Sequence, residues 1–411
     1  MSKVSQLRLV LGDQLNANHS WYRKTDPRVT YLIAELRQET DAVCHHIQTL
    51  CAMFKGMELF ARALSKAGHN VIYLTLDSTR STLSLPQLLD ELCAKHGFNS
   101  VAYQRPDEYR LLYQLRAYQA AADRDVEEYG TEHFLLPFDA LRMSFAPGAS
   151  LRMARFYRAM RKRFGYLMED GKPAGGQWQF ESPNHAAFDG AETVVAPPKP
   201  GYRNDVADIL ARIEHYVPRL FGRAESVLEM AITRRQARAQ LRIFCRYGLP
   251  LYGLLGVAKT EESVFEQRLY HSKLSFALNA KMVSASELVD TAIDAHRRNP
   301  SIISLVSIER FVRQIVGWRE YFRGQYWAAA PGINTFDSTD WVERDSDRAL
   351  SMAEYSHDIH ERAEHTTPRP PSALSRTNTG SFSVMSGLDP NDVEDWFLGE
   401  RDGSRELRAD T

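Results

Sequence analysis

The sequence predicts an α/β amino-terminal domain built on a Rossmann-like parallel sheet, followed by an all-α carboxy-terminal domain. Short apolar runs rich in β-branched and aromatic residues have the character of buried parallel strands. They lie at residues 7–12, 29–35, 70–77 and 100–104. Residues 41–67 carry apolar side chains three or four positions apart, which is the period of an amphipathic helix. Strands that alternate with helices in this way are typical of a parallel sheet covered on both faces.

The character of the chain changes along its length and divides it into expected parts. Residues 1–135 are expected to form the α/β domain, and 136–204 to form interdomain loops with a linker that contains a Pro-Pro-Lys-Pro run. Helical periodicity dominates residues 205–332, which we expect to form the helical domain. Residues 333–411 hold many polar and few apolar side chains, so we expect a diverged, poorly ordered segment there.

The overall composition is that of an ordinary globular protein, with 44% hydrophobic and 25% charged residues among 411. No apolar stretch approaches the roughly 18 residues that a membrane helix needs, and the amino terminus lacks the features of a secretory signal. We therefore expect a cytoplasmic protein with no membrane partner. Because the net charge is −1, any nucleic-acid surface must be a local one.

The cysteines predict neither a disulfide framework nor a metal site. There are four of them, Cys44, Cys51, Cys93 and Cys245. They are sparse for a chain of this length, and none belongs to a Cys-x-x-Cys pair. We therefore expect isolated buried thiols and no bound metal.

A cluster of basic residues follows the α/β part. Its members are Arg152, Arg155, Arg158, Arg161, Lys162 and Arg163. The first four recur every three positions, so on a helix they form one slowly turning basic stripe, which can neutralise DNA phosphates. A solvated helix face without a partner is the alternative interpretation. The DNA-binding candidates are Arg155, Arg158, Arg161 and Lys162.

Two later segments carry candidate cofactor-binding groups. Tyr270–Asn279 places hydroxyl, imidazole and amide groups within about two helical turns, a composition that suits a phosphate or pyrophosphate. Simple helix capping is the alternative. Ile308–Trp327 mixes arginines with aromatic residues, which can wall a flavin ring and hold its phosphates. An ordinary core helix with surface ion pairs explains the second segment equally well.

Several strings in the chain together resemble the deoxyribodipyrimidine photolyase-related family, the prokaryotic branch that includes (6-4) photolyases and related cryptochromes. They are Leu9–Leu15, Arg105–Leu111, Thr131–Leu135, Met153–Trp178, Leu269–Asn279, Phe311–Trp327 and Thr379–Gly399. The resemblance implies an α/β antenna domain, an all-α FAD-binding domain that is incomplete here, and a lyase that repairs damaged DNA with light. It also implies a monomeric protein whose partner is damaged DNA.

The resemblance assigns roles to individual residues. A lumazine-type antenna would lie near Gly12, Asp13, Gln14 and Glu35. The flavin neighbours would be His271, Ser272, Leu274, Ser275, Asn279, Arg313, Trp318, Arg319 and Tyr321. Trp396 would donate an electron close to the ring, and His357 is the nearest match to a histidine beside the lesion.

The chain also departs from the family pattern. The family holds an iron–sulfur cluster through four cysteines in its carboxy-terminal domain, whereas no cysteine here follows Cys245, so no cluster is expected. We expect a chain truncated at this end relative to the family, with Asp358 in place of the second lesion-side histidine. Repair of a pyrimidine dimer or a (6-4) lesion is therefore one hypothesis. A cryptochrome-like blue-light sensor and a degenerate relative that does not bind flavin are the others.

Overall fold

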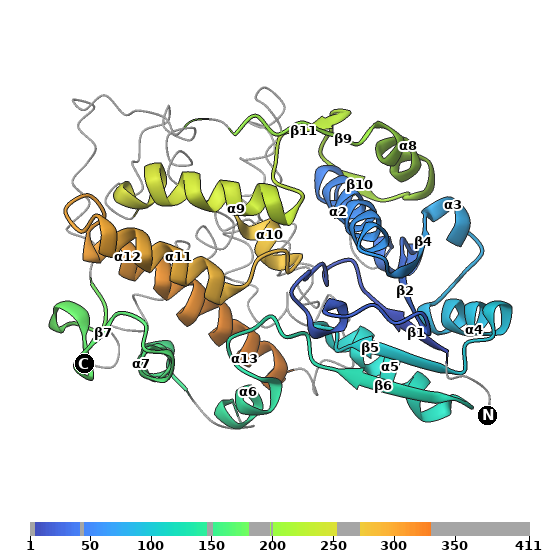
Figure 1. Ribbon diagram of the computed structural model, residues 1–411, viewed down its shortest axis with the longest axis horizontal. Coiled ribbons are helices and arrows are strands. Elements are labelled where there is room, and N and C mark those ends of the chain that lie inside the picture. Colours follow the sequence, from blue (N-terminus) through green and yellow to red (C-terminus); the bar gives the residue numbers. More distant parts are fainter. Residues whose placement is uncertain are drawn as a thin grey trace, which may run out of the picture.

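A parallel sheet of five strands, in the order β4-β2-β1-β5-β6, forms the centre of the amino-terminal half (Figure 1). The computed structural model describes residues 5–41, 45–145, 151–180, 198, 200–252 and 272–329. The strands of the sheet are β1 (Gln6–Leu9), β2 (Val29–Ala34), β4 (Asn70–Leu74), β5 (Ser100–Gln104) and β6 (Asp125–Tyr129). The helices of this half are α1 (Arg37–Thr40), α2 (Ile47–Lys66), α3 (Leu76–Thr79), α4 (Leu85–His96), α5 (Tyr109–Ala121) and α6 (Phe138–Ser144), with a 3₁₀ turn at Ser20–Tyr22.

The strand order confirms the predicted Rossmann-like sheet and locates its crevice. Strand β1 pairs in parallel with β2 on one side and with β5 on the other. The chain that leaves β1 continues to β2, whereas the chain that leaves β5 continues to β6 on the opposite side. In open sheets of this kind, ligands bind where the strand order reverses, outside the carboxyl ends of the strands. This crevice lies beyond β1 and β5.

The long helix α2 covers one face of the sheet. Its buried residues Leu50, Phe54, Met57 and Ala61 recur at three or four positions, as an amphipathic helix requires. The helix begins at Ile47, later than the expected residue 41, because α1 and a short strand precede it. The His46 side chain caps it by accepting a hydrogen bond from the amide of Gln48.

The carboxy-terminal half is helical, as predicted. Its helices are α7 (Met153–Phe164), α8 (Ala207–Tyr216), α9 (Arg234–Ile243), α10 (Ser275–Asn279), α11 (Ala285–Arg298), α12 (Leu305–Val312) and α13 (Glu320–Ala329). π-helical segments η3 (Phe244–Gly248) and η6 (Arg313–Arg319) extend α9 and join α12 to α13, and 3₁₀ turns lie at Ala174–Gly176 (η2) and Leu249–Leu251 (η4). Paired short strands are β3 (His45–His46) with β10 (Leu220–Phe221), β7 (Met168–Glu169) with β8 (Lys172–Pro173), and β9 (Asn204–Asp205) with β11 (Val227–Leu228).

The two halves share one hydrophobic core. Phe54 of α2, Val289 of α11 and Phe311 of α12 belong to the same buried cluster, whereas a second cluster lies under α4 and α5 on the other face of the sheet. Gly324 of α13 lies against the ring of Phe145, which follows α6. A Cβ atom at this position would overlap the ring, so α13 can pack this closely only with a glycine here. The helical half is therefore packed directly onto the sheet domain.

Helix α8 lies against the α/β half, although it follows the boundary expected at residue 205. It packs on α2 and α3, and the β10 strand that follows it pairs with β3 (Figure 1). The segment 205–228 therefore joins the two halves. Within the described part of the chain, no helix has the length and apolar character to cross a membrane.

Candidate functional site

Lys281 from the helical half occupies the crevice of the sheet. It follows α10 and is almost fully buried, with 2% of its side chain exposed. Its Nζ lies 2.6 Å from Oδ2 of Asp13, which follows β1, and 2.9 Å from Oδ2 of Asp107, which follows β5. Burial disfavours the ammonium charge, but the Asp107 and Asp13 carboxylates outweigh this effect and raise the pKa of Lys281. The lysine is therefore a charged, buried tie between the two halves.

His133 marks the point where the two predicted flavin segments meet. Its Nε2 lies 3.0 Å from Nη2 of Arg319, and its ring is buried. Burial lowers its pKa well below the usual range, and the charges of Arg319, Lys281 and Arg323 lower it further, whereas the backbone of Leu278 in α10 opposes the shift. A neutral imidazole here accepts a hydrogen bond from Arg319 while it lies beside α10.

Arg319 has unsatisfied hydrogen-bonding capacity at this junction. Burial lowers its pKa to about 10, and its Nη1 atom is buried without a hydrogen-bond partner among the described residues. Its Cζ atom lies 4.6 Å from the ring centre of Phe134, within cation–π distance. A buried guanidinium without a hydrogen-bonded carboxylate can bind an anionic or carbonyl group of a ligand.

The residues that follow Arg319 hold α13 on the α/β half. Oε1 of Glu320 accepts a hydrogen bond from the amide of Leu135 at 2.9 Å. Nη1 of Arg323 donates to the carbonyl oxygen of Leu136 at 2.9 Å and pairs with Glu320 at 3.3 Å. The charged side chains of this motif therefore fix the position of Arg319 relative to the sheet domain.

The segment that contains α10 contributes buried groups near this junction. Its predicted flavin neighbours that are buried are Ser272, Leu274 and Ser275. The carbonyl oxygen of Ser272 accepts a hydrogen bond from Nε2 of Gln240 in α9 at 3.1 Å. Asn279 ends α10 and is half-buried, whereas His271 lies outside the described residues.

The ion pair of Arg313 and the hydrogen bond of the Tyr321 hydroxyl lie away from the junction at Arg319. The Tyr321 hydroxyl donates to the carbonyl oxygen of Leu151 at 2.8 Å, and its ring packs against Phe156 of α7. The Trp318 ring contacts the Tyr321 ring. Arg313 pairs with Glu309 within its own helix at 3.6 Å. Of these predicted neighbours, the structure thus brings Arg319 to His133 and directs Tyr321 toward α7.

The two predicted catalytic residues, His357 and Trp396, lie outside the described residues.

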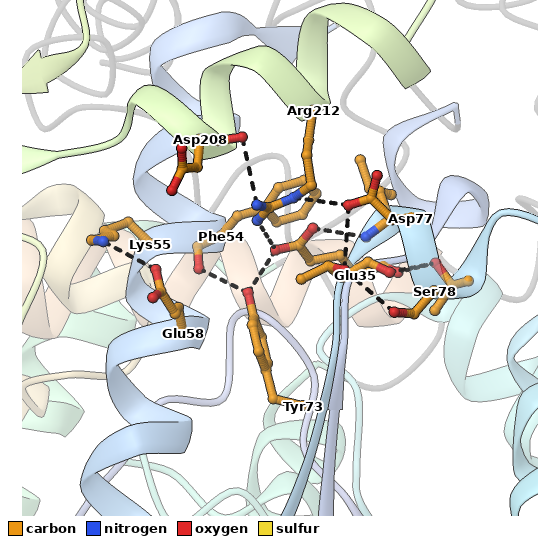
Figure 2. Close-up of polar contacts among 12 residues, drawn as sticks. Glu35, Phe54, Lys55, Glu58, Tyr73, Asp77, Ser78, Asp208 and Arg212 are labelled. Atoms are coloured by element: carbon orange, nitrogen blue, oxygen red, sulfur yellow. Dashed lines mark hydrogen bonds and ion pairs between the residues drawn. The ribbon is translucent and has the colours of Figure 1, made fainter.

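Glu35 is the centre of a second polar network, shown in Figure 2. It follows β2 and is fully buried. Its Oε1 accepts hydrogen bonds from the Tyr73 hydroxyl at 2.6 Å and from Nη2 of Arg212 at 3.0 Å, and its Oε2 accepts from the amide of Leu76 at 2.9 Å. Burial and the neighbouring Glu35 carboxylate raise the pKa of Tyr73 above its usual value. Helix α8 supplies Arg212, so the network ties α8 to the sheet.

A cleft of about 580 Å³ lies beside the Glu35 network. Its walls include Lys55 and Glu58 of α2, Tyr73 and Thr75 of the β4 end, and Asp208 and Arg212 of α8 (Figure 2). The Lys55 ammonium pairs with Glu58 at 3.0 Å. Pockets of roughly 300–1,000 Å³ are typical of small-molecule sites. The cleft therefore has the volume of a small-molecule site and is bordered by α2, β4 and α8.

Gln14 is not available to a ligand, which corrects its assignment to the antenna site. Its side chain is fully buried. The amide oxygen accepts from the backbone of Leu11 at 3.1 Å, and the amide nitrogen donates to the carbonyl oxygen of Gln104 at 3.1 Å. Its hydrogen-bonding capacity holds the β1 and β5 loops together.

Gly12 and Asp13 lie at the crevice, away from the walls of the Glu35 cleft. Asp13 is engaged by Lys281. A Cβ atom on Gly12 would lie 3.0 Å from the sulfur of Met57, so the glycine lets the β1 loop pack closely on α2. The antenna residues assigned by resemblance therefore divide between two places in the fold.

Acidic residues border the crevice beside Asp13. Burial and then the Glu108 charge raise the pKa of Glu39 to about 7, and Arg110 partly opposes this. Nε of Arg110 lies 2.9 Å from Oε1 of Glu108. One carboxyl of this group can therefore carry a proton at neutral pH.

The basic stripe on α7 is real but smaller than expected. Arg155, Arg158 and Lys162 are exposed along one face of the helix. Arg161 is fully buried, and its guanidinium donates to the carbonyl oxygens of Leu167 and Trp178. Arg161 is thus a structural anchor and cannot contact a DNA phosphate, which corrects its assignment as a DNA-binding residue.

Residues 8–228, just over half of the chain, match the family model described as deoxyribodipyrimidine photo-lyase-related protein. The chain belongs to this family. Among the described residues of this photolyase-related protein, no group of three or more histidine, cysteine, aspartate or glutamate side chains has the arrangement of a metal site. The described cysteines Cys51, Cys93 and Cys245 are free and buried.

Relatives of the photolyase-related chain cover most of its length. The (6-4) photolyase of Agrobacterium fabrum (strain C58) is 28% identical over 409 residues, which cover 96% of this chain and 77% of the relative. The crystal structure of a bacterial class III photolyase from Agrobacterium tumefaciens is similar over 79% of this chain, with 16% identity and a TM-score of 0.45. The present chain spans 59% of that solved chain.

Several residues of the photolyase-related site were not predicted individually. They are Asp107, His133, Lys281, Tyr73 and Arg212. Asp107 and His133 lie within strings that carry the resemblance, Arg105–Leu111 and Thr131–Leu135. Their place in those strings indicated that Asp107 and His133 could have a functional role. The residues that they contact come from distant parts of the chain, so the sequence could not name them.

Proposed function

We propose that this photolyase-related protein binds FAD in its helical half and acts under light on pyrimidine lesions in DNA, as a lyase of the deoxyribodipyrimidine photolyase type. The observation that carries this proposal is the junction at His133, whose ring contacts both Arg319 and the backbone of Leu278 in α10. The relative named as a (6-4) photolyase supports a (6-4) lesion or a pyrimidine dimer as the substrate class.

The residues at this junction fit an anionic cofactor. The buried Nη1 of Arg319 lacks a partner among the described residues, so it can donate to a phosphate or carbonyl oxygen. His133 keeps the guanidinium in place by accepting its other hydrogen bond. Ser272 and Ser275 are buried residues of the α10 segment and carry hydroxyl groups. FAD supplies one-electron chemistry when it is bound.

The cleft beside Glu35 is our proposed position for a lumazine-type antenna. Tyr73 and Arg212 line the cleft and are held by the buried Glu35 carboxylate, so their orientations are fixed before a ligand arrives. Lys55 and Glu58 offer a donor and an acceptor on the α2 wall. These groups suit a polar heteroaromatic ring with a hydroxylated side chain.

The exposed stripe of Arg155, Arg158 and Lys162 is our proposed contact to damaged DNA. Each basic side chain that neutralises a phosphate releases a counterion, so the affinity should fall as salt rises. A lesion in duplex DNA must leave the base stack to reach a buried site. We propose that one monomer performs this step.

An absorbance spectrum of the purified protein, after incubation with FAD and removal of free flavin, tests the proposal. Retained flavin bands support it. A colourless preparation would leave a degenerate relative that does not hold flavin. Illumination of a duplex that contains a (6-4) lesion or a pyrimidine dimer then separates a repair lyase from a blue-light sensor, because a sensor retains flavin but leaves both lesions intact.

A further inference from the structure

Helix α9 and the η3 segment carry a second basic surface on the described part of the molecule. Residues 230–260 contain no aspartate or glutamate, although the whole chain has a net charge of −1. The exposed arginines of this surface, which we call the arginine ridge, are Arg235, Arg238, Arg242 and Arg246. Positive charge is therefore concentrated in this segment, although the chain as a whole carries nearly equal numbers of basic and acidic residues.

The spacing of the ridge places its guanidinium groups in one line. The four arginines are three or four positions apart, so they share one face of the helix. The twelve residues from Arg235 to Arg246 are separated by eleven steps and extend about 16 Å at 1.5 Å per residue. Ala237, Leu241 and Phe244 occupy the buried face of the same segment. The ridge therefore points away from the core.

Three of the four ridge arginines have no carboxylate partner among the residues that the structure describes. Arg238 pairs with Glu287 of α11 at 2.9 Å, and Arg234 uses the other oxygen of the same carboxylate at 2.9 Å. No carboxylate of the described residues lies within ion-pair distance of Arg235, Arg242 or Arg246 (the only ion pairs on α9 are those of Arg234 and Arg238).

The amino-terminal end of the ridge is unfavourable for the local electrostatics of α9. Its first turn contains Arg234 and Arg235 and no acidic residue. Cations at a helix amino terminus meet the positive end of the macrodipole, and like charges four positions apart repel each other. Arg242 lies in the last turn of α9, where a cation is favourable, so the unfavourable effects are those of the first-turn charges and of the repulsion between neighbouring arginines. A polyanionic partner offsets both effects.

Two further features favour nucleic acid as that partner. The Arg246 guanidinium lies 5.2 Å from the ring centre of Tyr247, whose side chain is 39% exposed and can stack on a base or sugar. One strand of B-DNA presents a phosphate about every 3.4 Å along the axis while it winds around that axis, so a straight row of about 16 Å can meet the few phosphates that face it. Acidic protein surfaces have no such regular spacing.

We propose that the arginine ridge binds the sugar–phosphate backbone of duplex DNA, as a contact surface separate from the α7 stripe. The choice of DNA rests on the proposed function. Figure 1 shows α9 and α7 on opposite sides of the layer formed by α11, α12 and α13. The ridge lies on the outer face of the helix whose Gln240 contacts Ser272.

The experiment measures binding of a fluorescent, undamaged duplex by anisotropy over a series of salt concentrations. The test variant combines Arg235→Gln, Arg242→Gln and Arg246→Gln. The matched control combines Arg23→Gln, Arg80→Gln and Arg223→Gln, which are exposed arginines outside the ridge and change the net charge equally. Flavin content is recorded for every preparation.

Loss of three phosphate contacts should reduce the slope of log K against log salt by about 2.7 in the test variant, because each contact contributes about 0.9. The control should keep the wild-type slope. An unchanged slope in the test variant overturns the proposal, as does an equal reduction in both variants. Polyglutamate serves as a model of an acidic protein surface. The proposal is also overturned if the wild-type protein binds polyglutamate and does not bind the duplex. If the salt slope falls only in the test variant but the protein holds no flavin, the arginine ridge is supported and the proposed flavin-dependent function is refuted.

Discussion

Nε2 of His133 lies 3.0 Å from Nη2 of Arg319, and this contact joins the α/β half to the helical half. The two residues are 186 positions apart in the chain. The imidazole has to be neutral to accept this hydrogen bond, and burial lowers its pKa accordingly. Arg319 therefore presents its other nitrogen with a fixed orientation, which is the basis of the proposed flavin site.

His133→Phe should weaken FAD binding by about 10-fold or more, because a hydrogen bond to a charged group contributes about 1.5–3 kcal/mol and the phenyl ring cannot accept one. Equilibrium dialysis or fluorescence titration with FAD measures this change. His133→Gln retains an acceptor and should bind FAD more tightly than His133→Phe does. Equal affinities for the two variants would show that the histidine acts through packing alone.

Lys281→Met should lower the free energy of unfolding by about 3–5 kcal/mol, because removal of one partner leaves buried charges uncompensated. Asp13 and Asp107 are the carboxylates left without their cation. Urea denaturation followed by circular dichroism measures the change. Lys273→Met, which removes an exposed lysine from the same segment, should change stability by no more than about 0.5 kcal/mol. A similar small effect at Lys281 would contradict its role as an interdomain tie.

Arg161 and Arg158 should respond in opposite ways to replacement by glutamine. Arg161→Gln removes a buried donor to backbone carbonyls and should cost about 1–3 kcal/mol of stability. Arg158→Gln should leave stability unchanged and reduce the salt slope of DNA binding by about 0.9. Thermal unfolding and anisotropy titration separate the two effects. A stable Arg161→Gln protein with weakened DNA binding would reverse our correction.

The raised pKa of Glu39 predicts a specific pH dependence of stability. Between about pH 4.5 and 7 the folded protein keeps a proton at Glu39 that the unfolded chain has released. The contribution of Glu39 to the free energy of unfolding is therefore fully present below the pKa that Glu39 has in the unfolded chain. It is lost as the pH rises through about 7. In Glu39→Gln the free energy of unfolding should fall less steeply over this window. Parallel urea titrations at several pH values test this, and identical slopes would contradict it.

Local sequence patterns predicted much of the sheet domain. The runs at 29–35 and 100–104 became β2 and β5, because buried parallel strands have a continuous apolar character that needs no partner to be recognised. Strand β6, Asp125–Tyr129, was not predicted, since it is an edge strand with three acidic residues and exposed positions. Burial pattern and edge position depend on the sheet and cannot be inferred from five residues.

The candidate site was predicted by segment more successfully than by residue. Spacing and resemblance selected the α10 and α13 segments, yet they gave Arg161 a surface role that its buried contacts exclude. Lys281, Asp107 and His133 obtain their importance from contacts between distant parts of the chain. Such contacts leave no periodic pattern, and the sequence therefore indicates the residue types without indicating their partners.

Flavin retention tests the central claim most directly. The purified protein and its Arg319→Gln variant are incubated with FAD, freed of unbound flavin and examined by absorbance, with Arg297→Gln as an exposed control. Our account predicts flavin bands in the wild type and the control and a marked loss in Arg319→Gln. A wild type without flavin, or an Arg319→Gln protein that retains as much flavin as the control, would contradict it.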